Sequence, residues 1–194
     1  MDEKARLRAE LTARRDAMPA DERRRVAAIL AERLAALPQY AAARSVLATM
    51  SIGSEWSTRP FLERARTDGK AIVLPRISSS RPRRLELYSV GDLASDFVPG
   101  VWDIPEPDPA RCPAVALPEV DFAVIPALAA EPDGYRLGYG AGYFDKLLAG
   151  RGSRPFCVTA LPAAFVLERI PHEPHDVAVD LVMSEAGPAD RKAT

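Results

Sequence analysis

The chain has 194 residues, 47% of them hydrophobic, with 26 Lys plus Arg against 27 Asp plus Glu and a formal net charge of −1. This near balance gives no electrostatic support for binding to nucleic acid or to an anionic membrane. No apolar run approaches the roughly 20 residues of a membrane span, and the charged segment Met1–Glu10 lacks the apolar stretch of a signal peptide. Two cysteines in unrelated contexts, Cys112 and Cys157, are typical of free thiols in a reducing compartment. We therefore expect a cytoplasmic protein.

Hydrophobic spacing predicts helices that alternate with short apolar strands. In chain order we expect helices at residues 4–17, 21–37, 61–68, 143–148 and 163–169, and strands at residues 45–50, 71–74, 85–88, 121–125, 156–160 and 177–182. Pro38 and Pro75 are expected to end the elements before them. Residues 76–84 are expected to form a polar, basic loop, and the proline-rich residues 99–118 a packed coil.

This alternation predicts an α/β fold with a largely parallel central sheet flanked by helices. One core suffices for the length, so we expect a single domain over residues 1–186 and a flexible C-terminal tail over residues 187–194. Ligands in such folds lie beyond the carboxyl ends of the strands. Met50–Glu55 and a glycine-rich loop both follow apolar segments, so we expect them to share one rim of the sheet.

The segment Asp133–Asp145, DGYRLGYGAGYFD, carries the strongest functional signal. Its alternating glycines, Gly138, Gly140 and Gly142, permit positive φ and leave the backbone amides free to surround an anion. The segment matches neither the Walker loop nor the dinucleotide fingerprint. A plain glycine-rich turn between a strand and a helix is therefore the alternative interpretation.

Two charged residues flank this loop. Arg136 offers a planar guanidinium that suits phosphate oxygens. Asp145 is an oxygen ligand of the kind that Mg²⁺ takes beside a nucleotide. A phosphate cradle, a cation and a metal ligand so close together indicate nucleotide chemistry.

The segment Arg136–Asp145 resembles the signature of the 5-formyltetrahydrofolate cyclo-ligase family, also called 5,10-methenyltetrahydrofolate synthetases. Further blocks resemble the family in the same order: Lys4–Arg8, Met50–Thr58, Gly100–Pro107 and Glu173–Asp176. The resemblance implies a three-layer sandwich similar to the NagB/RpiA/CoA-transferase-like fold. It also implies that 5-formyltetrahydrofolate becomes 5,10-methenyltetrahydrofolate at the expense of Mg²⁺-ATP. In that reaction ATP phosphorylates the formyl oxygen, ADP leaves, and N10 closes the ring as phosphate departs.

The same resemblance assigns roles to individual residues. It implies catalytic contacts to the ATP phosphates from Lys4, Arg8 and Arg136, and it implies Mg²⁺ ligands in Asp145 and Asp176. The rest of the implied ATP site is Leu137, Gly138, Tyr139, Gly140, Ala141, Gly142, Tyr143 and Phe144. The implied folate contacts are Met50, Glu55, Trp102, Tyr139 and Tyr143. The chain departs from the family at Ala141, where many members have lysine, and at Phe144, where tyrosine is usual.

Helical geometry groups three cations of the first helix. At 100° per residue, Lys4, Arg8 and Arg15 fall within about 40° of one another, beside an apolar stripe that contains Leu7 and Leu11. The resemblance gives an ATP contact to Lys4 and Arg8 but not to Arg15. A solvated basic face remains the alternative for all of them.

Isolated residues have plainer interpretations as well. Glu55 alone would usually be a solvated loop residue or a helix cap, and Trp102 alone fits a half-buried core residue equally well. His172 and His175 lie three positions apart, but the prolines beside them disfavour a helix and no nearby cysteine completes a zinc site, so we expect no zinc.

Two other classes of function stay open: a non-catalytic module that binds folate, nucleotide or RNA, and a sugar-phosphate or CoA-ester enzyme on a similar scaffold. We expect an enzyme that acts on 5-formyltetrahydrofolate and ATP as a monomer, without a nucleic-acid or membrane partner.

Overall fold

The computed structural model describes residues 2–100 and 104–190. Its helices are α1 (Glu3–Asp16), α2 (Ala20–Ala35), α3 (Pro38–Ala42), α4 (Arg59–Thr67) and α5 (Tyr143–Leu148), with 3₁₀ turns at Leu117–Glu119 and Ala163–Phe165. The strands of the main sheet are β1 (Ser45–Leu47), β2 (Ala71–Ile77), β3 (Leu85–Val90), β6 (Ala114–Val115), β7 (Phe122–Val124), β10 (Phe156–Ala160), β11 (Leu181–Ser184) and β12 (Gly187–Pro188). Two small hairpins pair β4 (Phe97–Pro99) with β5 (Pro105–Pro107), and β8 (Ala129–Ala130) with β9 (Arg136–Leu137).

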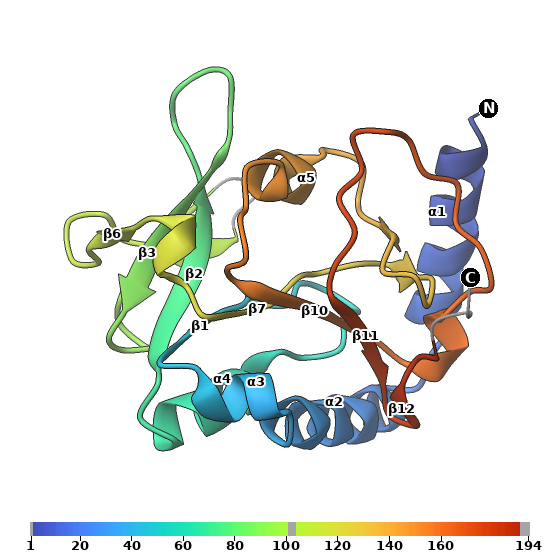
Figure 1. Ribbon diagram of the computed structural model, residues 1–194, viewed down its shortest axis with the longest axis horizontal. Helices are drawn as coiled ribbons and strands as arrows, with labels where there is room; N and C mark the ends of the chain where they lie inside the picture. Colours follow the sequence, from blue (N-terminus) through green and yellow to red (C-terminus); the bar gives the residue numbers. More distant parts are fainter. Residues whose placement is uncertain (1, 101–103, 191–194) are drawn as a thin grey trace.

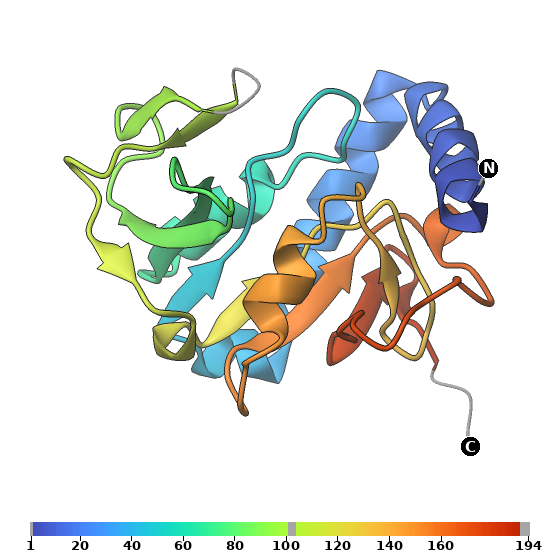
Figure 2. The same ribbon diagram turned by 90° about the horizontal axis from the view of Figure 1, so that it is seen from above.

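The main sheet has eight strands in the order β12-β11-β10-β7-β1-β2-β3-β6. The centre, from β11 to β2, is parallel, and the strands at both edges are antiparallel. Helices α2, α3 and α4 cover one face, while α5 lies over β7 and β10 on the other, where α1 also stands (Figures 1 and 2). The predicted three-layer α/β architecture with a largely parallel sheet is confirmed. The finer comparison with the NagB/RpiA/CoA-transferase-like fold stays a prediction.

The core forms where the apolar stripe of α2 meets the sheet. Val26, Leu30 and Leu34 recur at helical spacing, and each is at most 3% exposed. Full burial of such a side chain contributes about 1.5–3 kcal/mol. Phe61 of α4 and Phe122 of β7 belong to the same core, with ring centroids 6.2 Å apart. No helix in the described part of the chain has the length and apolar character to cross a bilayer.

Proline behaves differently from expectation at two positions. Pro38 does not close the second helix, which ends at Ala35; it begins α3, where the missing N–H costs no hydrogen bond. Pro75 does not end its strand, since β2 continues to Ile77. The register with β1 stops at Val73, and the N–H of Ile77 points to the Glu106 carboxylate at 3.2 Å. Alternate residues of a strand present their N–H groups to the same edge. Pro75 therefore lacks an N–H on the edge of β2 that faces β1, but β1 no longer pairs with β2 at this position, so no hydrogen bond is lost.

The C-terminal boundaries also differ. The last predicted strand begins at Leu181 rather than at Val177, because the backbone of residues 177–179 bonds to the hairpin β8–β9 instead of the sheet. Gly187 and Pro188, expected in a flexible tail, pair with β11 as β12. The predicted helix at residues 163–169 is only a 3₁₀ turn, since Val166 forms a bridge with Ala130. The expected coil at residues 99–118 contains β5 and β6.

One glycine controls how the β8–β9 hairpin joins the C-terminal segment. Gly134 has φ +101° and accepts a hydrogen bond from the Val179 N–H at 3.0 Å. A Cβ at this position would lie 2.3 Å from the Val179 carbonyl oxygen. Neither the backbone conformation nor the space suits a side chain.

We expect Gly134→Ala to lower the free energy of unfolding by about 2–4 kcal/mol, because it adds both strain and a clash. Gly150→Ala is the matched control, since its added Cβ meets nothing within 4 Å. Urea denaturation of both variants measures the difference. Equal stability of the two variants would contradict this account of the turn.

Candidate active site

A cavity of about 730 Å³ opens on the side of the sheet where β1, β2 and β7 end. Segments that are distant in sequence line it together: Arg15 and Asp16; residues 49–50 and 52–55; Leu74, Pro75, Ile77 and Leu85; residues 104–107; Pro126; and Arg136, Gly138, Tyr139 and residues 141–145. The expected common rim for Met50–Glu55 and the glycine loop is therefore confirmed. Trp102 lies outside the described residues.

The glycine loop runs from β9 to α5 along this cavity. Gly140 and Gly142 have φ +104° and +63°, whereas Gly138 has ordinary φ, so two of the three glycines use the left-handed region. Within residues 2–100 and 104–190, nothing accepts a hydrogen bond from the amides of Tyr139, Gly140, Ala141 and Gly142. These amides are therefore available to an anionic ligand, as a phosphate cradle requires.

Arg8 of α1 contacts the backbone of the glycine loop. Its Nε donates to the Gly138 carbonyl at 2.9 Å, and its Cζ lies 3.7 Å from where a Cβ on Gly140 would stand. The guanidinium thus packs against backbone that has no side chain to obstruct it. One cation is fixed beside the loop even though Ala141 supplies none.

Arg136 of β9 and Asp145 of α5, which flank the glycine loop, form an ion pair. Nη2 of Arg136 donates to Oδ1 of Asp145 at 2.9 Å, and only 3% of the arginine side chain is exposed. Nη1 donates to the Val177 carbonyl, and the Val177 N–H donates to Asp145 Oδ1 at 3.2 Å. Burial lowers the pKa of Arg136 and the Asp145 charge opposes that shift, so the guanidinium stays charged.

A second ion pair joins Lys4 to Asp176, the residue that precedes Val177. Nζ of Lys4 lies 2.7 Å from Oδ2 of Asp176 and 3.5 Å from Glu173. Burial disfavours both charges, but their hydrogen bond and mutual attraction outweigh it, raising the pKa of Lys4 and lowering that of Asp176. Because Asp176 adjoins Val177, which bonds to Arg136 and Asp145, the structure brings these four predicted charges into one alternating cluster.

Arg15, which the sequence left without a role, links the glycine loop to the loop after β1 in the cavity wall. Arg15 is 7% exposed; its Nε donates to Ser54 Oγ and its Nη1 to the Tyr139 hydroxyl, both at 2.9 Å. It also lies 4.0 Å from Glu55 Oε1. Although 49% of Tyr139 is exposed, partial loss of solvent and the neighbouring Glu55 raise its pKa, so its hydroxyl keeps its proton and can donate to that carboxylate.

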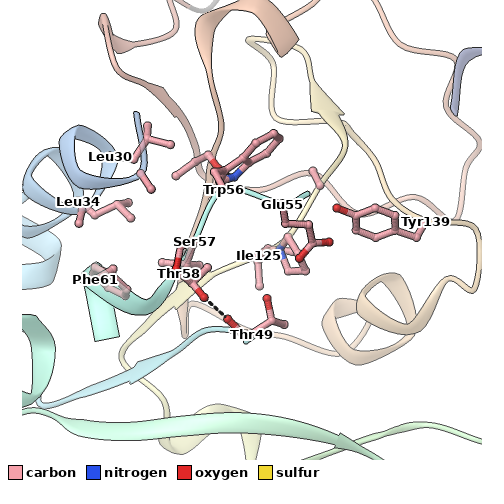
Figure 3. Close-up of a pocket in the computed structure, with 16 residues that line it drawn as sticks. Leu30, Leu34, Thr49, Glu55, Trp56, Ser57, Thr58, Phe61, Ile125 and Tyr139 are labelled. Carbon is pink, nitrogen blue, oxygen red and sulfur yellow. Dashed lines mark hydrogen bonds between the residues drawn. The ribbon is translucent and has the colours of Figure 1, made fainter. Parts of the chain in front are cut away.

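Glu55 is held from several sides. Its Oε2 accepts the Ile52 N–H at 2.9 Å, and Figure 3 shows the Tyr139 hydroxyl pointing towards its carboxylate. The adjoining Trp56 is buried, donates to the Ala160 carbonyl at 3.0 Å and packs on Phe165. Trp56 therefore anchors the strand-to-helix loop, which fixes the place of Glu55 in the cavity wall.

The other predicted site residues differ in whether they line the cavity. Met50, Tyr143 and Phe144 line the cavity, as does Gly142. Leu137 is buried in β9 and presents no side chain to a ligand. His172 stacks on Tyr135 with ring centroids 3.7 Å apart, and the described residues hold no cluster of three His, Cys, Asp or Glu side chains that could bind a metal.

Arg15 could have been found from the sequence only through its helical phase. It shares a face with Lys4 and Arg8, which the 3.6-residue period does predict. What the period cannot show is that Ser54 and Tyr139 fold against that face. Burial of the guanidinium is a tertiary property.

Comparison with known proteins decides the relationship. The sequence model described as the 5-formyltetrahydrofolate cyclo-ligase family matches residues 1–185. The chain belongs to this family. It is 31% identical over 146 residues to a 5-formyltetrahydrofolate cyclo-ligase of Mycolicibacterium smegmatis, covering 73% of each chain. It is 29% identical over 192 residues to the Mus musculus protein of that name, covering 94% of each.

Solved structures agree with the family. The NMR structure of Aquifex aeolicus 5,10-methenyltetrahydrofolate synthetase matches with a TM-score of 0.83 and 27% identity, over 98% of this chain and 95% of that one. A 5,10-methenyltetrahydrofolate synthetase from Mycoplasma pneumoniae shares the fold with a TM-score of 0.75 at 19% identity, over 95% and 99% of the two chains.

Proposed function

We propose that this chain converts 5-formyltetrahydrofolate to 5,10-methenyltetrahydrofolate, using ATP and releasing ADP and phosphate. The observation that carries the proposal is the row of amides from Tyr139 to Gly142, which find no hydrogen-bond acceptor among the described residues, on the wall of a large cavity. In a member of this family, such a loop is suited to the phosphates of ATP.

The nucleotide would lie along the glycine loop, with Leu137 and Phe144 at its two ends. Lys4, Arg8 and Arg136 supply positive charge around the amides. Arg136 and Lys4 are each held by a carboxylate, so their charges are already oriented before the ligand arrives. Preorganised charge of this kind stabilises a transferring phosphoryl group without reorganisation during the reaction.

Asp145 and Asp176 are the residues that would hold Mg²⁺. Their carboxylates lie in the cluster beside the glycine loop, and protein sites for Mg²⁺ typically supply one or two carboxylates, with phosphate oxygens and water completing the shell. Mg²⁺ bound there would neutralise charge on the phosphates.

The folate would occupy the part of the cavity beside Arg15. Glu55 presents a carboxylate to the paired 2-amino and ring N–H donors of the pterin, with Met50, Tyr139 and Tyr143 beside it. Trp102, in the block that follows Gly100, would contribute an aromatic face.

The chemistry requires alignment more than a protein nucleophile. The formyl oxygen attacks the γ-phosphorus of ATP, ADP leaves, and the formyl carbon becomes an electrophilic iminium phosphate. N10 of the same molecule then bonds to that carbon and loses its proton to solvent, and the C–O bond to phosphate breaks. Holding the formyl oxygen in line with the phosphorus replaces a bimolecular encounter with a positioned one.

The proposal also covers the cellular location and the oligomeric state of the enzyme. Buried free thiols at Cys112 and Cys157 support a cytoplasmic location. We propose a monomer that needs neither nucleic acid nor membrane for activity.

Purified protein incubated with Mg²⁺-ATP and 5-formyltetrahydrofolate is expected to form the methenyl product, detected by its near-ultraviolet absorbance, with one ADP per product. A binding module would bind either ligand without turnover. A sugar-phosphate or CoA-ester enzyme would leave the folate unchanged. Either result would reject the proposed reaction.

The metal assignment predicts a changed Mg²⁺ requirement. We expect Asp145→Asn and Asp176→Asn each to raise the Mg²⁺ concentration for half-maximal rate by about tenfold, because an amide keeps the shape but loses the charge that attracts a hard dication. Asp121→Asn is the control, since Asp121 is ion-paired with Arg154 outside the cavity. Unchanged Mg²⁺ midpoints in both site variants would remove these aspartates from the metal site.

The contacts of Arg15 predict that its substitution changes KM for the folate selectively. We expect Arg15→Met to raise KM for 5-formyltetrahydrofolate about tenfold, the scale for losing a charged hydrogen bond, with KM for ATP changed far less. Arg15→Lys should recover part of the loss. Arg14→Met is the neighbouring control, because the Arg14 guanidinium lies 5.4 Å from the Phe165 ring centroid. Equal effects of Arg15→Met on both substrates would indicate a general structural role.

A further inference from the structure

One buried carboxylate in the cavity wall has no role in the proposed chemistry. Glu106 of β5 lines the cavity and is only 5% exposed. Its Oε1 accepts the Ile77 N–H at 3.2 Å, whereas its Oε2 is buried and accepts no hydrogen bond from any described residue. A buried acceptor without a donor is costly, so such an atom in a native fold calls for an explanation.

Arg76 offsets the charge of this carboxylate without satisfying Oε2. Its Nε lies 3.8 Å from Oε2, which is beyond hydrogen-bonding distance. Its Nη1 donates instead to the Pro107 carbonyl at 2.9 Å. Arg76 therefore ties β5 to β2 and leaves Oε2 of Glu106 available to another donor.

Gly100, which follows β4, lies against the same carboxylate. A Cβ at this position would lie 2.3 Å from Cδ and 2.4 Å from Oε2 of Glu106. Glu106 can occupy its place only because Gly100 has no side chain. Since the terminal torsion of a glutamate is broad, a small rotation of the carboxylate turns Oε2 from Gly100 towards the cavity.

The surroundings of Glu106 indicate which ligand group can complete it. Phosphate or carboxylate oxygens would be repelled by its charge. A metal ion needs several oxygen ligands, but here it would find one carboxylate beside the Arg76 guanidinium. Pro75, Ile77 and Ile104 of the same lining are apolar. A neutral N–H group on a largely apolar molecule meets none of these obstacles.

We propose that Glu106 is a further folate-binding residue, whose Oε2 accepts a hydrogen bond from an N–H group of 5-formyltetrahydrofolate other than the donors assigned to Glu55. The inference rests on the proposed function. One acceptor in an otherwise apolar part of the wall fixes the orientation of the folate there. The alternative is a structural role alone, in which Glu106 only fastens β5 to β2 through the Ile77 N–H.

Glu106→Gln separates the two roles, because glutamine has the shape of glutamate but one acceptor oxygen instead of two. Its amide oxygen can keep the Ile77 N–H, and its NH₂ group then stands in the place of Oε2. Glu131→Gln is the comparison. Glu131 is also 5% exposed and accepts the Ile170 N–H at 2.8 Å, but it lies outside the described lining of the cavity.

Gly100→Ala displaces the Glu106 carboxylate without changing its chemistry. Gly150→Ala is its comparison, since an added Cβ there meets nothing within 4 Å. Isothermal titration calorimetry measures Kd for 5-formyltetrahydrofolate without nucleotide, and Kd for ADP without folate, in the wild type and all four variants. Thermal melting establishes which variants are folded.

We expect Glu106→Gln to raise Kd for 5-formyltetrahydrofolate about tenfold, the scale for losing a hydrogen bond to a charged group, and to leave Kd for ADP unchanged. Gly100→Ala should raise the same Kd, while Glu131→Gln and Gly150→Ala should match the wild type. If Glu106→Gln does not fold, Gly100→Ala decides the question.

Unchanged folate binding in these two site variants would leave Glu106 with the structural role alone and overturn the inference. Tighter folate binding by Glu106→Gln would overturn it as well, because the ligand would then present an acceptor at this place. A raised Kd for ADP alone would assign Glu106 to the nucleotide. Lack of turnover by a wild type that binds the folate would instead reject the proposed reaction and not the role of Glu106.

Discussion

The buried guanidinium of Arg136 is the constraint on which the site depends. With 3% of its side chain exposed, its charge must be compensated inside the protein, and Asp145 and the Val177 carbonyl do this. These contacts join the end of the β8–β9 hairpin, the first turn of α5 and the segment before β11. The glycine loop lies between the first two of these attachments. Its backbone is therefore held at both ends, while the amides of Tyr139 to Gly142 have no acceptor in the part of the chain that the structure describes.

Helix α1 closes the same region through charge rather than through an extensive apolar contact. Lys4 reaches Asp176, Arg8 reaches the Gly138 carbonyl, and Arg15 reaches Ser54 and Tyr139. One helical face thus touches the C-terminal segment, the glycine loop and the loop after β1. Such contacts cost desolvation, so they are poor sources of stability. Their value is geometric, because they fix where cations and carboxylates stand around the cavity.

The cavity wall has two chemically different parts. In one part Arg15, Glu55 and Tyr139 form a polar group suited to a heterocycle with several N–H donors. At the glycine loop Arg136 and Asp145 line the cavity, and the ion pair of Lys4 with Asp176 lies beside them outside the lining. This arrangement suits phosphate and a divalent cation. The β2–β3 side of the wall is apolar up to Ile77 and Leu85. A reaction between a folate and a nucleotide needs these environments to meet over one reacting pair of atoms.

The sequence by itself determined the features that depend on local pattern. The stripe Val26, Leu30 and Leu34 predicted α2, the alternation of elements predicted the α/β class, and the glycine spacing with its flanking Arg136 and Asp145 predicted a nucleotide-related loop. Family resemblance in five blocks added the reaction, which membership of the family supports. It also added roles for Lys4, Arg8, Met50, Glu55 and Asp176, and these roles remain proposals. All of these follow from neighbours along the chain or from matching motifs.

Only the tertiary structure decided the pairings. Whether Pro75 ends a strand depends on where β1 stops beside it, and whether Gly187 lies in a tail depends on the open edge of β11. Arg15 and Arg8 carry the same charge on the same face, yet one is placed against Ser54 and Tyr139 and the other against the Gly138 carbonyl. Likewise, the sequence could mark Asp145 as a candidate metal ligand, but not as the counter-ion that Arg136 needs. Burial and charge compensation arise from segments far apart in the chain, so no local pattern encodes them.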